Sequence, residues 1–204
     1  LKAGRETQGH RFEAKRPVVS IKDADSYAEL MDKEGAVIAG FAARRDEISR
    51  QLKAAAEKAG LKPIEDEALL DEVTALVEWP NVLTCQFEEE FLDVPQECLI
   101  LTMKANQKYF PLLNAAGKLT NKFLVVSNIR PDDPGAVIGG NERVVRSRLA
   151  DAKFFFDQDR RKTLASRVFG LAKVVYHNKL GTQGERAQRV AGIARAICER
   201  FGDA

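Results

Sequence analysis

The sequence predicts an α+β fold, in which mixed helices accompany a small, mostly antiparallel sheet without a parallel doubly wound unit. Several segments repeat apolar residues at three- and four-residue intervals, which is the spacing of an amphipathic helix. Short runs of aromatic and β-branched residues, separated by Asn and Gly, indicate strands joined by turns. Strands and helices do not alternate in the regular way that a parallel sheet requires. With 204 residues, 45% of them hydrophobic, the chain is long enough to bury a core.

The N-terminal part is expected to be extended first and helical afterwards. Residues 1–20 are largely polar and are predicted as an extended N-terminal segment, with a short strand at Val18–Ile21. Asp23 is expected to cap a first helix, which Gly35 ends. Two further amphipathic helices are predicted at about 44–58 and 66–77.

The middle of the chain combines strands with one helix. Strands are predicted at about 82–87, 109–113 and 123–127. Pro95 is expected to begin a helix that runs to Asn106, because proline suits the first turn of a helix. Asn114–Gly117 provides turn residues between the last two strands, so these are expected to form a hairpin.

The last third is predicted to be mainly helical. A Pro/Gly-rich connection over Asn128–Gly140 is followed by helices at about 141–156, at 162–169 and from 184, with a short strand at 174–176. We assign residues 21–180 to an α+β body and residues 181–204 to the start of a following helical domain. The sequence has no initiator Met and stops within a helical pattern, so we expect it to be a fragment of a longer protein.

The net charge of +2 conceals a strong asymmetry along the chain. Between Glu57 and Leu99 there are twelve acidic residues and two lysines, a balance of −10. Between Asn141 and Arg200 there are fourteen basic and six acidic residues, a balance of +8. A basic surface concentrates polyanions around it, which favours a nucleic-acid partner. The alternative is that the two regions neutralise each other across an internal contact.

The helix expected at Asn141–Phe156 is the strongest candidate for a phosphate-binding surface. Asn141 is a suitable N-cap, and the apolar residues fall within one arc that should face the core. These apolar residues are Val144, Val145, Leu149, Ala152, Phe155 and Phe156. Arg143, Arg146 and Lys153 fall on the other side, where cations on a rigid helix could meet successive phosphates. A purely solvated face remains an equal alternative.

Arg148 is an exception on this helix because it projects into the apolar arc. A buried guanidinium must be paired or must extend to water, since an unpaired buried charge is costly. Asp151, one turn further, is the expected partner. We therefore predict a structural ion pair between Arg148 and Asp151.

The sequence offers little support for an active site, a metal or a membrane segment within this chain. It has two histidines and three cysteines, and none of them has the spacing of a zinc site or a disulfide framework. The unpaired cysteines fit a reducing cytoplasm. Gly117–Thr120 contains the lysine of a phosphate-binding loop but lacks its first glycine. The acidic run Glu88–Glu90 is more typical of a solvated turn than of a metal site. No apolar run has the ~20 residues that a membrane span needs.

Several blocks taken together resemble the beta subunit of the bacterial heterotetrameric glycyl-tRNA synthetase. The blocks occur in the expected order over nearly the whole chain. They are Thr7–Phe12, Leu69–Pro80, Gln107–Pro111, Val126–Asn128, Gly140–Val144, Arg148–Phe155 and Lys179–Thr182. Arg11 and Lys108, which lie within these blocks, are also expected to contact tRNA.

The resemblance implies a role within a larger enzyme. In that family the complete enzyme joins glycine to its tRNA with ATP, and the adenylate-forming centre, with its ATP and magnesium, lies in the separate alpha subunit. The beta subunit contributes to tRNA binding. We therefore expect this fragment to bind no cofactor, to carry no active site of its own, and to have the alpha subunit and glycine tRNA as partners. An architectural module that docks the alpha subunit and contacts no RNA is the alternative.

Overall fold

The computed structural model describes residues 4–202 and confirms the α+β class. Contacts divide the chain into two units, Leu1–Lys153 and Phe154–Ala204. Residues 1–3 and 203–204, the outermost parts of the expected terminal segments, lie outside the described residues. The division falls inside a long helix, and the domain limits expected after residues 20 and 180 stay predictions.

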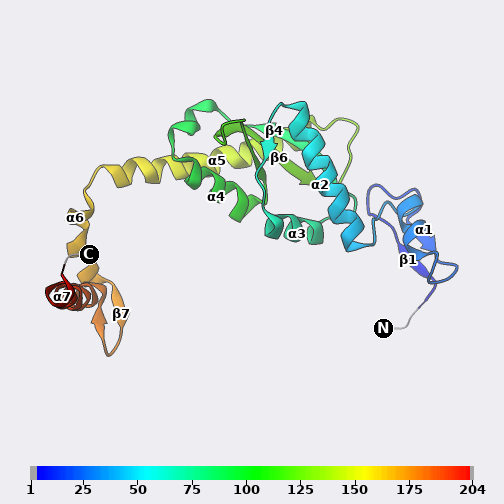
Figure 1. Ribbon diagram of the computed structural model, residues 1–204. Coiled ribbons are helices and arrows are strands. Elements are labelled where there is room, and N and C mark those ends of the chain that lie inside the picture. Colours follow the sequence, from blue (N-terminus) through cyan, green and yellow to red (C-terminus); the bar gives the residue numbers. More distant parts are fainter. Residues whose placement is uncertain (1–3, 203–204) are drawn as a thin grey trace. The chain divides into compact units, whose positions relative to one another are not determined.

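A four-stranded antiparallel sheet lies at the centre of the first unit (Figure 1). Its strands are β3 (Lys62–Pro63), β4 (Asn81–Gln86), β5 (Phe110–Leu113) and β6 (Leu119–Ser127), in the order β3-β5-β6-β4. The three strands expected in the middle of the chain, at about 82–87, 109–113 and 123–127, are present as β4, β5 and β6. β5 and β6 form the expected hairpin. Among the described strands, β4 pairs only with β6 and is therefore an edge strand.

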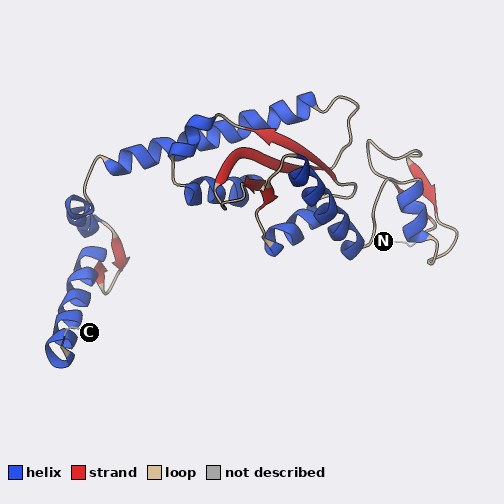
Figure 2. Cartoon of the chain, turned by 45° about the horizontal axis from the view of Figure 1, so that its top comes forward, coloured by secondary structure: helices blue, strands red, loops and turns tan. Residues whose placement is uncertain are grey.

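One face of the sheet is covered by two helices, α2 (Phe41–Lys58) and α3 (Glu67–Leu76) (Figure 2). Alternate residues of β5 and β6 point to this side because successive side chains of a strand face opposite ways. They pack against the apolar stripes of the two helices. This cluster contains Ile48, Leu52, Ala56, Leu69, Leu70, Val73, Val77, Phe110, Leu112 and Leu124.

The opposite face of the sheet carries Phe123, which is fully buried and packs against Tyr109 with ring centroids 4.9 Å apart. Helix α4 (Gln96–Gln107) buries Leu99 and Met103 and passes directly into β5. Helix α5 (Gly135–Arg160) runs along the same side (Figure 1). A short 3₁₀ helix, Glu89–Asp93, connects β4 to α4.

The N-terminal segment contains a small hairpin of β1 (Glu6–Gln8) and β2 (Val18–Ser20), followed by helix α1 (Tyr27–Lys33). The strand expected at residues 18–21 is thus confirmed. The helix begins later than expected because Asp23 makes a turn instead: its Oδ1 accepts a hydrogen bond from the N–H of Ser26 at 2.8 Å. Ser26 then occupies the N-cap position.

Helix α5 begins at Gly135, six residues before the expected N-cap Asn141. The carboxylate of Asp133 accepts a hydrogen bond from the Gly135 N–H at 2.8 Å, and Pro134 precedes the first helical residue. Gly139 and Gly140, which suggested a break, lie inside the helix. Each costs about 1 kcal/mol relative to alanine, so tertiary contacts must compensate.

The second unit contains α6 (Leu164–Arg167), a 3₁₀ helix (Val168–Lys173), the pair β7 (Val175–His177) and β8 (Gly181–Thr182), and α7 (Gln183–Phe201). Thr182 and Glu185 form a capping box at the start of α7. The helix expected from residue 184 is thus confirmed and begins at Gln183. None of the described side chains of this unit, residues 154–202, is buried. One face of α7 exposes Val190, Ile193, Ile197 and Phe201.

Across the described residues, no helix combines the length and the apolar composition that crossing a membrane requires.

Candidate nucleic-acid interface

Helix α5 is fixed to the rest of the first unit by polar contacts in its N-terminal half. The hydroxyl of Tyr109 donates a hydrogen bond to Oδ1 of Asn141 at 2.8 Å, and the Asn141 amide donates to the carbonyl of Val137 at 2.8 Å. Burial raises the pKa of Tyr109 to about 12, so this hydroxyl stays a neutral donor at physiological pH. Asn141 is therefore an anchor within the helix and not its cap.

A second contact holds the same part of α5 at the edge of the sheet. Glu142 accepts a hydrogen bond from the backbone N–H of Gln86 at 2.9 Å. This satisfies an outward-pointing donor of the edge strand β4, which would otherwise be open to another chain. Burial, helped by the nearby Glu142 carboxylate, raises the pKa of the neighbouring Cys85 thiol to about 12.

The buried face of α5 is narrower than the sequence pattern indicated. Val145 and Leu149 are fully buried, as expected. Val144 and Phe155, which were expected in the core, are 42% and 64% exposed. The apolar residues of this helix outnumber the positions that the sheet covers.

Arg148 was expected to project into the apolar face of this helix, but in the structure it is exposed and does not enter the core. No ion pair joins it to Asp151 anywhere in the described chain, and Asp151 is exposed as well. The narrow buried face of α5 explains this outcome. With its head in water, Arg148 needs no buried partner.

Arg143 and Arg146 lie on the exposed part of α5 but differ in their surroundings. Arg146 forms an ion pair with Glu88, with Nη2 and Oε1 2.5 Å apart and a hydrogen bond from Nε at 2.6 Å. This guanidinium lowers the pKa of the Glu88 carboxyl below its usual value. Arg143 forms no ion pair within residues 4–202. Arg143 is thus the more available of the two for a phosphate.

The other expected contacts come from separate parts of the first unit. Lys153 is half-buried at the end of this unit and already makes a contact of its own. Lys108 ends α4 in the left-handed conformation, with φ of 57°, and its Nζ lies 2.8 Å from Glu72. Arg11 is exposed, with its guanidinium 5.9 Å from the ring centroid of Phe12.

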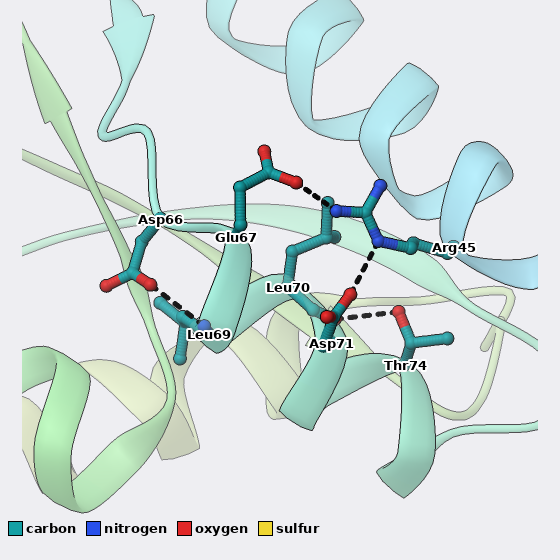
Figure 3. A network of polar contacts seen from close by, with 7 residues as sticks. All are labelled: Arg45, Asp66, Glu67, Leu69, Leu70, Asp71 and Thr74. Carbon is teal, nitrogen blue, oxygen red and sulfur yellow. Dashed lines mark hydrogen bonds and ion pairs between the residues drawn. The ribbon is translucent and has the colours of Figure 1, made fainter. Parts of the chain in front are cut away.

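The acidic region contributes to internal ion pairs around α3 (Figure 3). Arg45 reaches from α2 to Glu67 and Asp71, and its Nε lies 2.5 Å from Asp71. Asp66 caps α3 by accepting a hydrogen bond from the Leu69 N–H at 2.9 Å. The Lys104 ammonium, which pairs with Asp66, and this backbone donor together lower the pKa of the carboxyl.

The ion pairs of the first unit show which cations neutralise its acidic region. Five of the twelve acidic residues of region 57–99 are paired: Asp66, Glu67, Asp71, Glu72 and Glu88. Glu88 is paired with Arg146 of region 141–200. The other four are paired with Arg45, Lys104 and Lys108, which precede that region. Within the first unit, the acidic region is therefore neutralised mainly by cations from outside region 141–200.

The described residues contain no group of three His, Cys, Asp or Glu side chains that could hold a metal ion. His10, the buried histidine, has a structural role. Its Nδ1 accepts hydrogen bonds from the backbone N–H groups of Phe12 and Glu13, each at 3.2 Å.

A second set of cations is brought together only by the fold. Arg50 and Lys58 on α2 and Lys122 on β6 line one groove, although they are far apart in the sequence. Helical spacing places Arg50 and Lys58 on one side of α2, but no sequence pattern showed that β6 would bring Lys122 beside them.

Comparison with known proteins identifies the family of this chain. A family model described as glycyl-tRNA synthetase beta subunit matches residues 1–204. The glycine–tRNA ligase beta subunit of Leptothrix cholodnii is 78% identical over 201 residues, 98% of this chain. Those of Thiobacillus denitrificans and Delftia acidovorans are 75% and 74% identical over 99% and 100% of the chain. The chain spans 28% of the length of the first relative and 29% of the other two. It therefore belongs to the glycyl-tRNA synthetase beta-subunit family.

Proposed function

We propose that this chain is part of a glycine–tRNA ligase beta subunit and contributes to tRNA binding and subunit organisation during ATP-dependent glycyl-tRNA aminoacylation. The catalytic centre, with its ATP and magnesium, lies in the separate alpha subunit. The enzyme is a cytoplasmic heterotetramer, and this part of it binds no cofactor. Family membership over the whole chain carries the proposal. The exposed Arg143, without an ion pair in residues 4–202, supplies a phosphate-binding group.

The strength of each arginine's contact with a tRNA phosphate is expected to depend on whether an ion pair must first be broken. Arg143 can meet a phosphate without breaking an ion pair. Arg146 must first leave Glu88 or share it, and exposed ion pairs are worth at most about 1 kcal/mol. Both guanidiniums can offer two parallel hydrogen bonds to a phosphate.

A mobility-shift measurement with glycine tRNA tests the proposal. Arg143→Glu is expected to weaken binding by about tenfold, since a favourable contact becomes a repulsive one. Glu88→Gln is expected to strengthen binding, because it releases Arg146 and removes a nearby negative charge. Asp151→Asn is the matched control for Glu88→Gln, because it also removes one exposed negative charge but releases no arginine. Unchanged affinity in a folded Arg143→Glu, Arg146→Glu double variant would refute RNA contact by α5.

A specific observation favours the second candidate, in which the chain docks the alpha subunit without touching RNA. Glu89, Glu90 and Asp93 project from the turn after β4 and form no ion pair in the described chain. They present a negative surface that suits a basic protein partner and repels phosphate. A pull-down of the alpha subunit by this chain tests it. Capture that is lost when these three residues are changed to their amides, with no tRNA binding by the chain, would support this candidate.

A further inference from the structure

An open groove of about 450 Å³ lies between α2 and the edge of the sheet. Arg50 and Lys58 line it from α2, Thr84 from β4 and Lys122 from β6. Figure 1 shows α2 beside β4 and β6, the elements that form its walls. The groove is distinct from the exposed face of α5, since none of the α5 cations lines it.

The charge of this groove is positive. No carboxylate is among its lining residues. Lys58 is exposed and Lys122 is half-buried, and neither forms an ion pair within residues 4–202. Arg50 is held by Glu47, one turn earlier on α2, through two hydrogen bonds of 2.7 Å. The groove thus has two lysines ready to bind an anion and an arginine whose position is already fixed.

The shape of the groove lets a backbone approach closely. Its α2 side carries alanines between the two cations, including Ala54 and Ala55, and these short side chains leave the space between the long ones open. Arg50 and Lys58 are eight residues apart, which is about 12 Å along the helix axis. That separation suits contacts with more than one phosphate of the same strand, rather than with a single small anion.

The edge strand adds a neutral donor. The N–H groups of Val82 and Gln86 point away from β6, since they donate to the side chains of Gln51 and Glu142, each at 2.9 Å. Thr84 lies between them with the same alternation, so its N–H also points outward. No side chain of the described residues accepts a bond from this N–H, and the Thr84 side chain is exposed beside it. Outward backbone N–H groups are common ligands of phosphate oxygens.

We propose that this groove binds the phosphate backbone of tRNA, with Lys58 and Lys122 as the principal contacts. The inference rests on the proposed function, which supplies RNA as the polyanion, and adds a second contact surface to α5. Lys58 also stabilises the C-terminal end of α2 through the helix dipole. The helix dipole does not explain why Lys122, on a strand, lines the same groove. Nor does it explain why no carboxylate is among the lining residues.

Affinity for glycine tRNA, measured by filter binding over a salt series, tests the groove. Lys58→Glu and Lys122→Glu are each expected to weaken binding by about three- to tenfold at low salt. Each neutral variant, Lys58→Gln or Lys122→Gln, is expected to lower the magnitude of the salt slope by about 1. Lys53→Glu is the matched control, because Lys53 lies on α2 but outside the groove, and it is expected to leave affinity within about twofold.

The outcomes separate this inference from the proposed function. Suppose that the folded Lys58 and Lys122 variants bind tRNA as the unchanged chain does, while Arg143→Glu still weakens binding. The tRNA contact of the groove is then refuted, and the proposed function stands. If the unchanged chain binds no tRNA, both are wrong. An equal loss in Lys53→Glu also overturns the groove, because the effect would then follow net charge alone. Since the Gln variants retain most of the side-chain volume, they keep the test decisive if a Glu variant does not fold.

Discussion

At the residue scale, Asp66 shows how one side chain serves two purposes. Its carboxylate caps α3 through the Leu69 N–H and pairs with Lys104 from α4. The sequence alone placed Asp66 at the start of this helix, because an aspartate before an apolar repeat is a common N-cap. It gave no sign of Lys104, which lies 38 residues further along the chain and meets Asp66 only after folding.

The cap and the ion pair of Asp66 can be separated by two substitutions. Asp66→Ala removes both and is expected to cost about 1 kcal/mol of unfolding free energy at pH 7. Asp66→Asn keeps a good N-cap and loses only the charge, so its cost is expected to be smaller. Urea denaturation of the three proteins measures these differences.

The pH dependence of the Asp66 contribution has a definite sign. The pKa of this carboxyl is lower in the folded chain than its ordinary value of about 4. Its stabilisation is therefore fully present above pH 4 and is lost as the pH falls through the lower, folded-state pKa. The difference between the unchanged chain and Asp66→Ala is expected to shrink in this range. A difference that grows on acidification would contradict the assignment.

Cysteine reactivity provides a second test at this scale. Burial and the nearby Glu142 hold the pKa of Cys85 at about 12, so its thiol stays protonated at pH 8, whereas Cys98 and Cys198 are exposed. The thiolate is the reactive form, and it must also be reached by the reagent. Iodoacetamide at pH 8 is expected to label Cys98 and Cys198 but not Cys85 until denaturant is added. Mass spectrometry locates the labels, and equal labelling of all three in the native chain would show that Cys85 is not enclosed.

At the scale of elements, α5 shows both the success and the failure of sequence reasoning. Helical spacing identified the helix and its buried Val145 and Leu149. It could not identify the start at Gly135, because the internal glycines favour a break. The bond of Asn141 to Tyr109, which helps to hold the helix there, joins two distant segments. The same limitation produced the inward placement of Arg148, since periodicity shows how residues are grouped around a helix but not how wide a face its neighbours cover.

The orientation of α5 leads to a direct stability prediction. Leu149→Ala removes a fully buried side chain and is expected to cost about 2–5 kcal/mol of unfolding free energy. Val144→Ala, on the same helix but 42% exposed, is expected to cost less than about 1 kcal/mol. Thermal and urea unfolding of both variants provides the comparison. Similar losses would mean that the buried face of α5 is the one inferred from the sequence and not the one found in the structure.

At the scale of the molecule, the charge asymmetry gains a structural explanation. The acidic region is partly neutralised around α3 by Arg45, Lys104 and Lys108, three cations that lie outside the C-terminal basic region. Four of the five paired carboxylates of the acidic region are therefore bound by cations from outside the basic region. The fold class and most elements could be predicted from local patterns. The groove of Lys58 and Lys122 could not, because it depends on which face of the sheet α2 covers.

The central claim is that this chain binds tRNA through its exposed cations, and the salt dependence of tRNA affinity tests it most directly. With Arg143, Lys58 and Lys122 each neutralising one phosphate, the logarithm of the association constant is expected to fall linearly with the logarithm of salt concentration, with a slope of about −2 to −3. Filter binding of glycine tRNA between low and physiological salt measures this slope. An affinity that does not change with salt, or the absence of any binding at low salt, would contradict the claim.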